Sequence, residues 1–297
     1  MTGWCAQESR ARGESPLGTA SRARRWILLE QPGAWGRDAL RESDLPPAVA
    51  ERLLAWSRDL PARVLLLRRP AGGRPIGTER ALYAGVSGPG ERWLEWLPLE
   101  HVDDLLDLDL TPLRDGRTLG GLRVLDPLYL VCTNGKHDPC CARDGLPIAR
   151  DLVDVVPDRV WESSHVGGDR FAGNLVCLPD GLFYGHLDVG SARAAVAANE
   201  GGRIDLEHFR GRSCHPFAVQ AAEGLLRRRL AIQGTDALAL VDVERRGDRH
   251  LVRFVHRDGR TLVAEIATGR AGTQQPLTCS GPPASAPSYD LVGVREE

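Results

Sequence analysis

The segment from Leu130 to Asn174 places soft metal ligands directly after two short apolar runs. It contains three of the seven cysteines and two of the eight histidines in this chain of 297 residues. Cys132 ends one apolar run, and His165 closely follows the other. In a mostly parallel α/β sheet, functional loops gather at the carboxyl ends of neighbouring strands. We therefore interpret this segment as a metal or cluster site built on two strand ends.

The ligand types and their spacing restrict what such a site can hold. Thiolates and imidazoles select zinc, copper or iron–sulfur units over magnesium and calcium. Cys132 and Cys141 lack the tight C-x2–4-C spacing of zinc ribbons and fingers, which disfavours a mononuclear structural zinc site. His165 and Asp169 form an i, i+4 pair on the second loop. Two cysteines nine positions apart on one loop, and an i, i+4 pair on the other, favour two sulfide-bridged irons. Each loop would bind one iron.

Three motifs also carry a family resemblance: CTNGKHDPCC from Cys132, SHVGGDRFAGN from Ser164, and GRSCHP from Gly211 followed by VQAAE. Together they resemble the sucrase/ferredoxin-like family, which is related to the thioredoxin-like ferredoxins. The resemblance extends from about Gly18 to Glu223 and implies a [2Fe–2S] cluster. In the bis-histidine branch of that family, two cysteines bind one iron and an H-x-x-x-H pair binds the other.

Carried over to this sequence, the family pattern matches Cys132, Cys141 and His165, but Asp169 stands where a histidine is expected. Three interpretations of this departure are open. Asp169 can ligate as a carboxylate, which would lower the reduction potential relative to a second imidazole. Another residue can supply the fourth bond, or the site can be degenerate and hold no cluster. The other candidate ligands are Cys140, Cys177, His186 and Cys214.

We expect four further residues to contact or shape the cofactor. Gly167 and Gly168 allow a tight turn that brings backbone N–H groups toward the sulfides. His137 stands close enough in sequence to couple electron transfer to proton transfer. Arg170 is expected to hydrogen-bond Asp169 or to balance the charge of the cluster.

The function predicted from these residues is one-electron transfer to or from a redox partner protein, by a carrier rather than by an enzyme with its own substrate. One alternative is a thiol-dependent, thioredoxin-like oxidoreductase that uses Cys140 and Cys141. Another is a cluster-free binding module. The net charge of −2 gives no electrostatic case for nucleic acid or an anionic membrane. Irregular cysteine spacing and the lack of a signal-peptide core or a bilayer-length apolar run predict a cytoplasmic protein.

The order of predicted elements indicates an α/β fold with an internal repeat. A β-α-β unit followed by two strands and a helix occurs twice, at an offset of about a hundred residues, so that WILLE matches LYLVC. We expect two tandem thioredoxin-like units, followed by a C-terminal helix and a β-meander. The predicted parts are a flexible N-terminus (1–20), a cysteine-poor unit (21–120), a cluster-binding unit (121–203), a helix with strands (204–270) and a tail (271–297).

Overall fold

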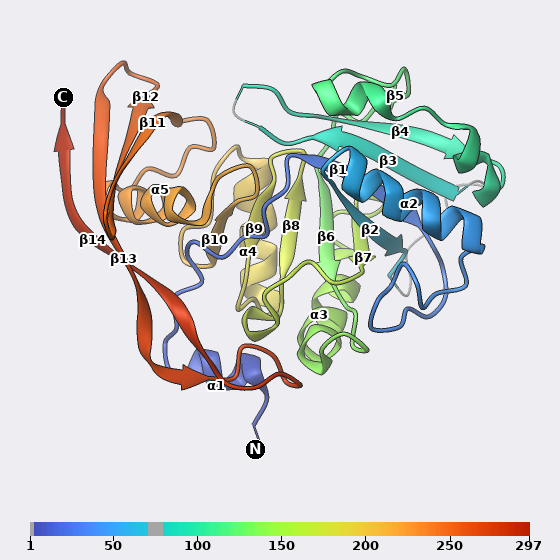
Figure 1. Cartoon of the computed structure of the whole chain (residues 1–297), viewed down its shortest axis with the longest axis horizontal. Coiled ribbons are helices and arrows are strands. Elements are labelled where there is room, and N and C mark those ends of the chain that lie inside the picture. The colour runs from blue at the N-terminus through green and yellow to red at the C-terminus, as the bar shows by residue number, and fades with distance from the viewer. Residues whose placement is uncertain (1–2, 71–79, 89) are drawn as a thin grey trace.

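The structure is a computed structural model that describes residues 3–70, 80–88 and 90–297. Within these residues the chain forms a 10-stranded mixed sheet and a separate 4-stranded antiparallel sheet (Figure 1). Helices pack against both sheets. The predicted α/β class is therefore confirmed.

The first unit of the large sheet consists of β1 (Arg25–Glu30), α2 (Pro47–Asp59), β2 (Ala62–Arg68), β3 (Arg80–Val86) and β4 (Trp93–Leu99). Strand β1 pairs in parallel with β2 and antiparallel with β3, which in turn pairs antiparallel with β4. The strand order is β2-β1-β3-β4. Helix α2 covers one face of this unit, because its apolar residues recur at helical spacing and are buried: Val49, Leu53 and Trp56.

The second unit repeats this arrangement. Strand β6 pairs in parallel with β7 and antiparallel with β8, which pairs antiparallel with β9, in the order β7-β6-β8-β9. The strand order and directions match those of the first unit, as the tandem hypothesis predicts. The elements of this unit are β6 (Leu128–Cys132), α3 (Pro139–Leu152), β7 (Val160–Ser163), β8 (Leu175–Leu178), β9 (Leu182–Tyr184) and α4 (Val189–Glu200).

The two units differ where the first one ends. The sequence pattern predicted a helix after the two strands, but the chain forms two short 3-10 helices there, η1 (Val102–Asp107) and η2 (Thr111–Asp115). Strand β5 (Leu122–Arg123) then pairs with β4 at the edge of the sheet. Aspartate is a weak helix former, which is consistent with the short turns in this acidic segment.

The two units are fused along a seam between strands β2 and β7. These strands pair antiparallel, and Arg68 forms an ion pair with the buried Glu162, with Nη2 and Oε2 2.7 Å apart. One hydrophobic core contains residues from both units, among them Trp26, Leu65, Leu130 and Trp161. The first unit is therefore part of the same packed body as the second.

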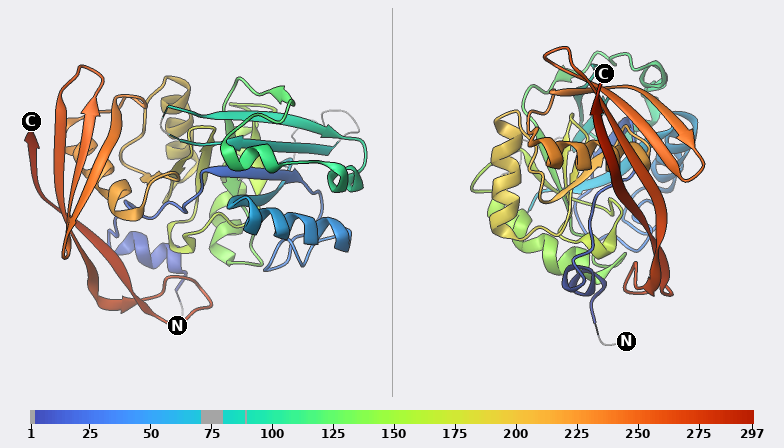
Figure 2. Two further views of the ribbon diagram at one scale, coloured as in Figure 1. Left: turned by 45° about the horizontal axis from the view of Figure 1, so that its top comes forward. Right: turned by 90° about the vertical axis from the view of Figure 1, so that its left-hand side faces the viewer.

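The C-terminal part extends the large sheet and then forms the small one. Strand β10 (Phe209–Arg212) pairs with β9 at the edge of the large sheet. Helix α5 (Phe217–Leu230) packs its apolar face on the small sheet (Figure 2). The strands of the small sheet are β11 (Leu238–Arg246), β12 (Arg249–His256), β13 (Thr261–Gln275) and β14 (Ala284–Glu296).

Two segments that the sequence predicted to be loose are ordered. In the predicted flexible N-terminus, of which residues 1–2 lie outside the description, Cys5–Ala11 form helix α1, and Cys5 is fully buried. The predicted tail supplies the end of β13 and all of β14. Figure 1 shows α1 at the bottom of the view, beside the turn of the β13–β14 hairpin. Both segments are ordered because they are buried against other parts of the fold. Local sequence patterns do not show such long-range contacts.

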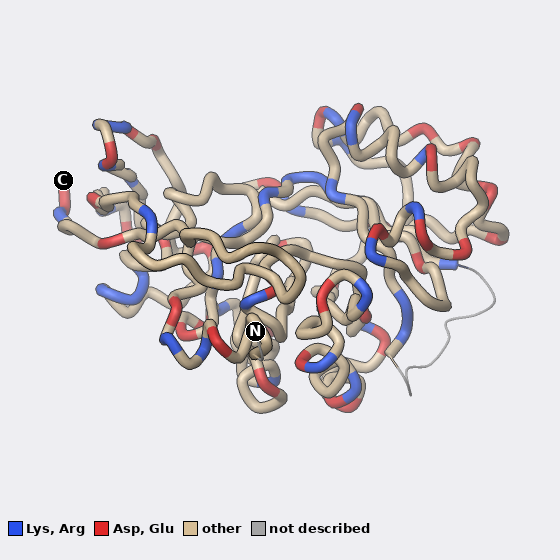
Figure 3. The backbone as a smooth tube through the Cα atoms, turned by 60° about the horizontal axis from the view of Figure 1, so that its bottom comes forward, with Lys and Arg blue, Asp and Glu red and all other residues tan. Residues whose placement is uncertain are grey.

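Charge is distributed without a large contiguous field. Figure 3 shows acidic and basic residues interspersed along the described chain, in keeping with the net charge of −2. Among the helices described, none is long and apolar enough to cross a membrane.

The third sequence motif forms a buried ionic network between the two sheets. Glu223 of α5 accepts hydrogen bonds at Oε1 from the Nε atoms of Arg212, at 3.0 Å, and Arg227, at 2.9 Å. The side chains are almost inaccessible to solvent. Burial alone would raise the pKa of Glu223, but the two guanidinium groups outweigh it and lower the pKa to about 2. The network fastens α5 to the edge of the large sheet at β10.

We predict that Glu223→Gln lowers the free energy of unfolding at neutral pH by about 3–5 kcal/mol, because two buried guanidinium groups lose their counter-charge. The depressed pKa means that the wild-type contribution is complete above the ordinary value of 4.5 and is lost as pH falls toward about 2. The difference between wild type and variant should shrink over that range in denaturant titrations. Glu244→Gln, which removes an exposed partner of Arg246, is the control and should leave the midpoint unchanged. Equal effects of the two substitutions would contradict the assignment.

Candidate metal centre

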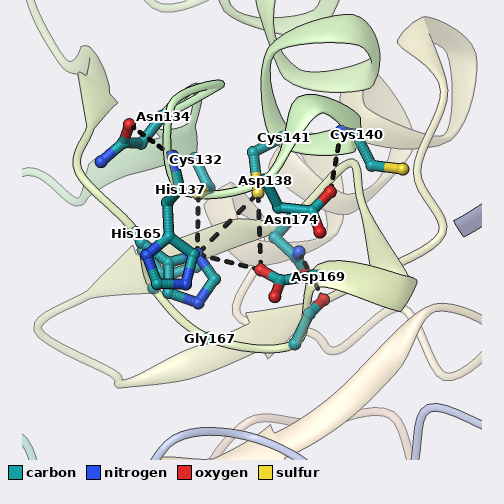
Figure 4. A network of polar contacts seen from close by, with 12 residues as sticks. Cys132, Asn134, His137, Asp138, Cys140, Cys141, His165, Gly167, Asp169 and Asn174 are labelled. Atoms are coloured by element: carbon teal, nitrogen blue, oxygen red, sulfur yellow. Dashed lines mark hydrogen bonds and ion pairs between the residues drawn. The ribbon is translucent and has the colours of Figure 1, made fainter. Parts of the chain in front are cut away.

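Strands β6 and β7 bring two loops to the same edge of the sheet. They are parallel neighbours, and the register pairs Cys132 with Ser163 at their carboxyl ends. Cys132 is the last residue of β6, and His165 follows the end of β7 by two positions. The two loops therefore emerge side by side. Figure 4 shows Cys132 and His165 directed toward a common point.

The first turn of helix α3 brings a second thiol to this point. The carboxylate of Asp138 caps the helix by accepting a hydrogen bond from the Cys140 N–H at 2.9 Å, and Pro139 occupies the first helical position. Consecutive residues of an α-helix point roughly 100° apart. Cys141 accordingly faces Cys132, whereas Cys140 points away (Figure 4).

The structure brings together all four predicted metal ligands. The Nδ1 atom of His165 lies 3.8 Å from the Sγ atom of Cys132 and 3.8 Å from that of Cys141. The Oδ1 atom of Asp169 lies 3.2 Å from the same Nδ1 atom and 3.9 Å from the Cys141 Sγ atom. Both thiols are fully buried, and Asp169, which begins the short helix η3 (Asp169–Phe171), is only 4% exposed.

His137 is a fifth ligand-type side chain at the same place. Its ring stacks on that of His165, with centroids 3.7 Å apart and an interplanar angle of 11°. Its Nδ1 atom lies 3.2 Å from the carbonyl oxygen of Arg37, so donation of an N–H to that carbonyl leaves Nε2 with a free lone pair. The sequence predicted that His137 lies beside the cofactor, and the structure places its ligand atom with those of His165 and Asp169.

Gly167 and Gly168 shape the loop through their backbone conformation. Their φ angles are +92° and +83°, a region that side chains disfavour. A Cβ atom on Gly168 would lie 2.3 Å from a guanidinium nitrogen of Arg210, and one on Gly167 would lie 2.3 Å from the Ser21 Oγ atom. The glycines thus let the loop turn and pack closely against Arg210 and Ser21.

The positive charges near the site differ from those predicted. The Arg170 guanidinium is directed to Glu14 rather than to Asp169, with Nε and Oε1 2.7 Å apart. Arg210, which the sequence analysis did not single out, is fully buried and donates to the carbonyl of Gly167 at 2.9 Å. Burial, and then the charge of Arg170, lower the pKa of Arg210 to about 9. Arg210 immediately precedes the third motif, and this position was the only indication in the sequence that it contributes to the site.

The ionisable groups of the site shift one another's pKa values. The hydrogen bond with Cys141, followed by the interaction with His165, lowers the pKa of Cys132, and the same thiol pairing raises the pKa of Cys141. Burial would lower the pKa of His165, but the hydrogen bond and charge of Cys132 raise it overall. Burial raises the pKa of Asp169. These protons are the ones that a bound metal would displace.

The structure places the other candidate ligands elsewhere. Cys177 packs in the core between the sheet and helices α3 and α4, separate from the core that contains Cys132 and Cys141. The Nε2 atom of His186 lies 3.1 Å from the Ser9 Oγ atom, and Cys214 lies in the loop after β10. Cys140 joins a different group of thiols. Because Cys140 and Cys141 point to different groups, the geometry does not favour them as a nucleophile and resolving pair.

A family model of sucrase/ferredoxin-like proteins matches residues 16–211, well over half of the chain. The chain belongs to the sucrase/ferredoxin-like family. In this family member the matched region contains both units of the large sheet and all five ligand-type residues of the site. Helix α1 and the small sheet lie outside it. No curated protein and no solved structure matches the chain.

We predict that Gly145→Ala disrupts the site. A Cβ atom on this residue of α3 would lie 2.1 Å from the carbonyl oxygen of Cys132, so α3 would have to move away from β6 and take Cys141 with it. The expected result is a lower metal content and a loss of about 1–3 kcal/mol in the free energy of unfolding. Gly190→Ala in α4 is the control, because its nearest neighbouring atom would be 3.6 Å away. Retention of metal and stability by Gly145→Ala would contradict the close packing.

Proposed function

We propose that this chain binds a [2Fe–2S] cluster between the loops after β6 and β7 and acts as a one-electron carrier. The observation that carries the proposal is a pair of overlapping donor groups. The ligand atoms of Cys132, Cys141 and His165 lie within 4.8 Å of one another, and so do those of His137, His165 and Asp169. Soft sulfur donors lie on one side of the site, and nitrogen and oxygen donors on the other.

The number and type of donors fit a two-iron unit. A tetrahedral ion such as zinc takes four ligands, whereas this site offers five in two groups that share His165. In a [2Fe–2S] unit each iron takes two protein ligands, and mixed thiolate and imidazole sets occur. Cys132 and Cys141 would hold the inner iron, and His165 with Asp169 would hold the outer one. His137 is the alternative partner of His165.

When bound, such a cluster would supply reversible one-electron chemistry. The chain provides an insulated inner side and a more accessible outer side, because both thiols are fully buried whereas the His165 side chain is 18% exposed. A surface hollow reaches the stacked histidines and is lined by residues of both units, among them Arg37, Leu40, Val64, Asn134, His137 and His165. We propose this hollow as the docking position of a redox partner protein.

Two arginines would tune the charge of the centre. Arg210 is fully buried behind the Gly167 turn, and Arg63 donates to the carbonyl oxygen of His165 at 2.9 Å. Positive charge close to thiolates and a carboxylate favours their ionised forms. The same charge would stabilise the reduced state of a cluster and so raise its potential. This contribution opposes the effect of a carboxylate ligand at Asp169.

Anaerobically purified protein should contain about two irons and two sulfides per chain and show an EPR signal after reduction. His165→Ala should change that signal or abolish it, because it removes the donor common to both groups. Cys214→Ser, which alters a thiol outside the site, is the control and should retain the wild-type spectrum and iron content. Protein that binds no iron after reconstitution, or that holds a single ion at Cys132 without sulfide, would refute the cluster.

The fourth ligand can be assigned with matched substitutions at Asp169 and His137. If Asp169 ligates, Asp169→His should raise the midpoint potential, on the order of 100 mV, because a neutral imidazole replaces a carboxylate. The potential should also fall more steeply with rising pH, since reduction favours protonation of a ligating imidazole. His137→Ala should then leave the EPR spectrum nearly unchanged. The reverse pattern, with a spectrum sensitive to His137→Ala and indifferent to Asp169→Ala, would assign His137 instead.

A further inference from the structure

Three cysteines from distant parts of the chain meet on the other side of helix α3. Cys5 comes from α1, Cys140 from the first turn of α3, and Cys279 from the turn between β13 and β14. Their Sγ atoms are 3.7 Å apart for Cys5 and Cys140, 3.4 Å for Cys140 and Cys279, and 3.4 Å for Cys5 and Cys279. Cys5 and Cys140 are fully buried. The group is separate from Cys132 and Cys141.

The carboxylate of Asp138 completes this group. Its two oxygen atoms lie 3.9 Å and 3.8 Å from the Cys5 Sγ atom. They also accept hydrogen bonds from the N–H groups of Cys140, at 2.9 Å, and Cys279, at 2.7 Å. Asp138 is only 1% exposed, so the fold buries a carboxylate against three thiols. A buried carboxylate requires hydrogen bonds, a counter-charge or a metal.

We propose that Cys5, Cys140, Cys279 and Asp138 form a second metal centre that binds one zinc ion. A tetrahedral ion with zinc–sulfur bonds of about 2.3 Å holds its sulfur ligands about 3.8 Å apart, close to the separations found here. A disulfide would require about 2.05 Å between two of the sulfurs. Thiolate-rich tetrahedral sites select zinc or iron–sulfur units, and three thiols with one carboxylate supply the four ligands that a single tetrahedral ion takes.

The surroundings suit a closed structural site. The N–H group of Cys5 donates to the Cys279 Sγ atom at 3.5 Å, a contact that favours a thiolate. On zinc binding, three thiol protons would pass to solvent, and the ion with three thiolates and one carboxylate would carry a charge of about −2. Arg143, on the same helix turn, shares the carboxylate of Asp144 with Arg10, at 2.6 Å and 3.0 Å, so these two guanidinium groups and one carboxylate leave net positive charge beside this helix turn. All four ligands come from the protein, as in structural rather than catalytic zinc sites.

The proposed zinc would fasten both ends of the chain to the helix that carries Cys141. Other contacts already connect these parts: Arg10 of α1 forms an ion pair with Asp144 of α3, with Nη1 and Oδ2 3.0 Å apart. A zinc ion would add a direct link to the β13–β14 turn. The adjacent residues Cys140 and Cys141 would then serve two different metal centres from one helical turn.

The test is metal analysis of full-length protein purified without chelators and supplied with zinc. We expect about one zinc per chain, with three sulfur neighbours at about 2.3 Å and one oxygen neighbour in zinc-edge X-ray absorption. Cys279→Ser changes the most exposed of the three thiols and should reduce the zinc content at least fivefold while iron and sulfide remain. Cys214→Ser is the matched control and should retain zinc.

Cys132→Ser distinguishes this centre from the proposed cluster. It should remove iron and leave zinc in place, so that failure of either centre is visible independently of the other. The proposal would be overturned by wild-type protein that takes up no zinc, or by a disulfide among Cys5, Cys140 and Cys279 in non-reducing mass spectrometry. It would also be overturned if zinc were lost from Cys132→Ser but kept by Cys279→Ser.

Discussion

The first turn of helix α3 is the constraint on which the site depends. Asp138 caps the helix and Pro139 fixes its start, so the orientation of the next two side chains follows from helical geometry alone. Cys141 then faces Cys132 because Gly145, one turn further on, lets the helix approach the end of β6. A larger residue at that glycine would separate the two thiols. Backbone packing therefore sets the distance between positions 132 and 141, and the cysteines at these positions place their thiols within that distance.

The cysteine-poor first unit contributes to the site through its edge. Strand β2 lies against β7, and its backbone and side chains hold the loop that carries His165: the N–H of Leu66 donates to the Ser164 Oγ atom at 3.0 Å, and Arg63 donates to the His165 carbonyl. The first unit also lines the surface hollow that reaches the stacked histidines. The first unit thus supports the site, because its described residues rigidify and shield the ligand loop of the neighbouring unit.

The sequence was sufficient for features that depend on local patterns. Apolar periodicity and turn residues repeat within each unit, and this repetition predicted the succession of strands and helices along the chain, except for the helix expected at the end of the first unit. The meeting of Cys5 with Cys279 could not be predicted in this way, since 274 positions separate them and each sits in a polar segment. Strand β14 was missed because the prolines before it are typical of a tail, whereas its partner β13 supplies the pairing. Arg210 was missed because burial of an arginine is decided by tertiary contacts.

The position of α3 between two groups of thiols has a consequence for folding. Cys141 can remain close to Cys132 only while the helix start is fixed, and that start also carries Cys140, which α1 and the β13–β14 turn enclose. Metal binding free energy is folding free energy wherever the ligands are not preassembled in the unfolded chain. Ligation on either side of the helix would therefore favour the same helix position. With both proposed metals bound, ordering of the two chain ends would be coupled to the geometry of the site between β6 and β7.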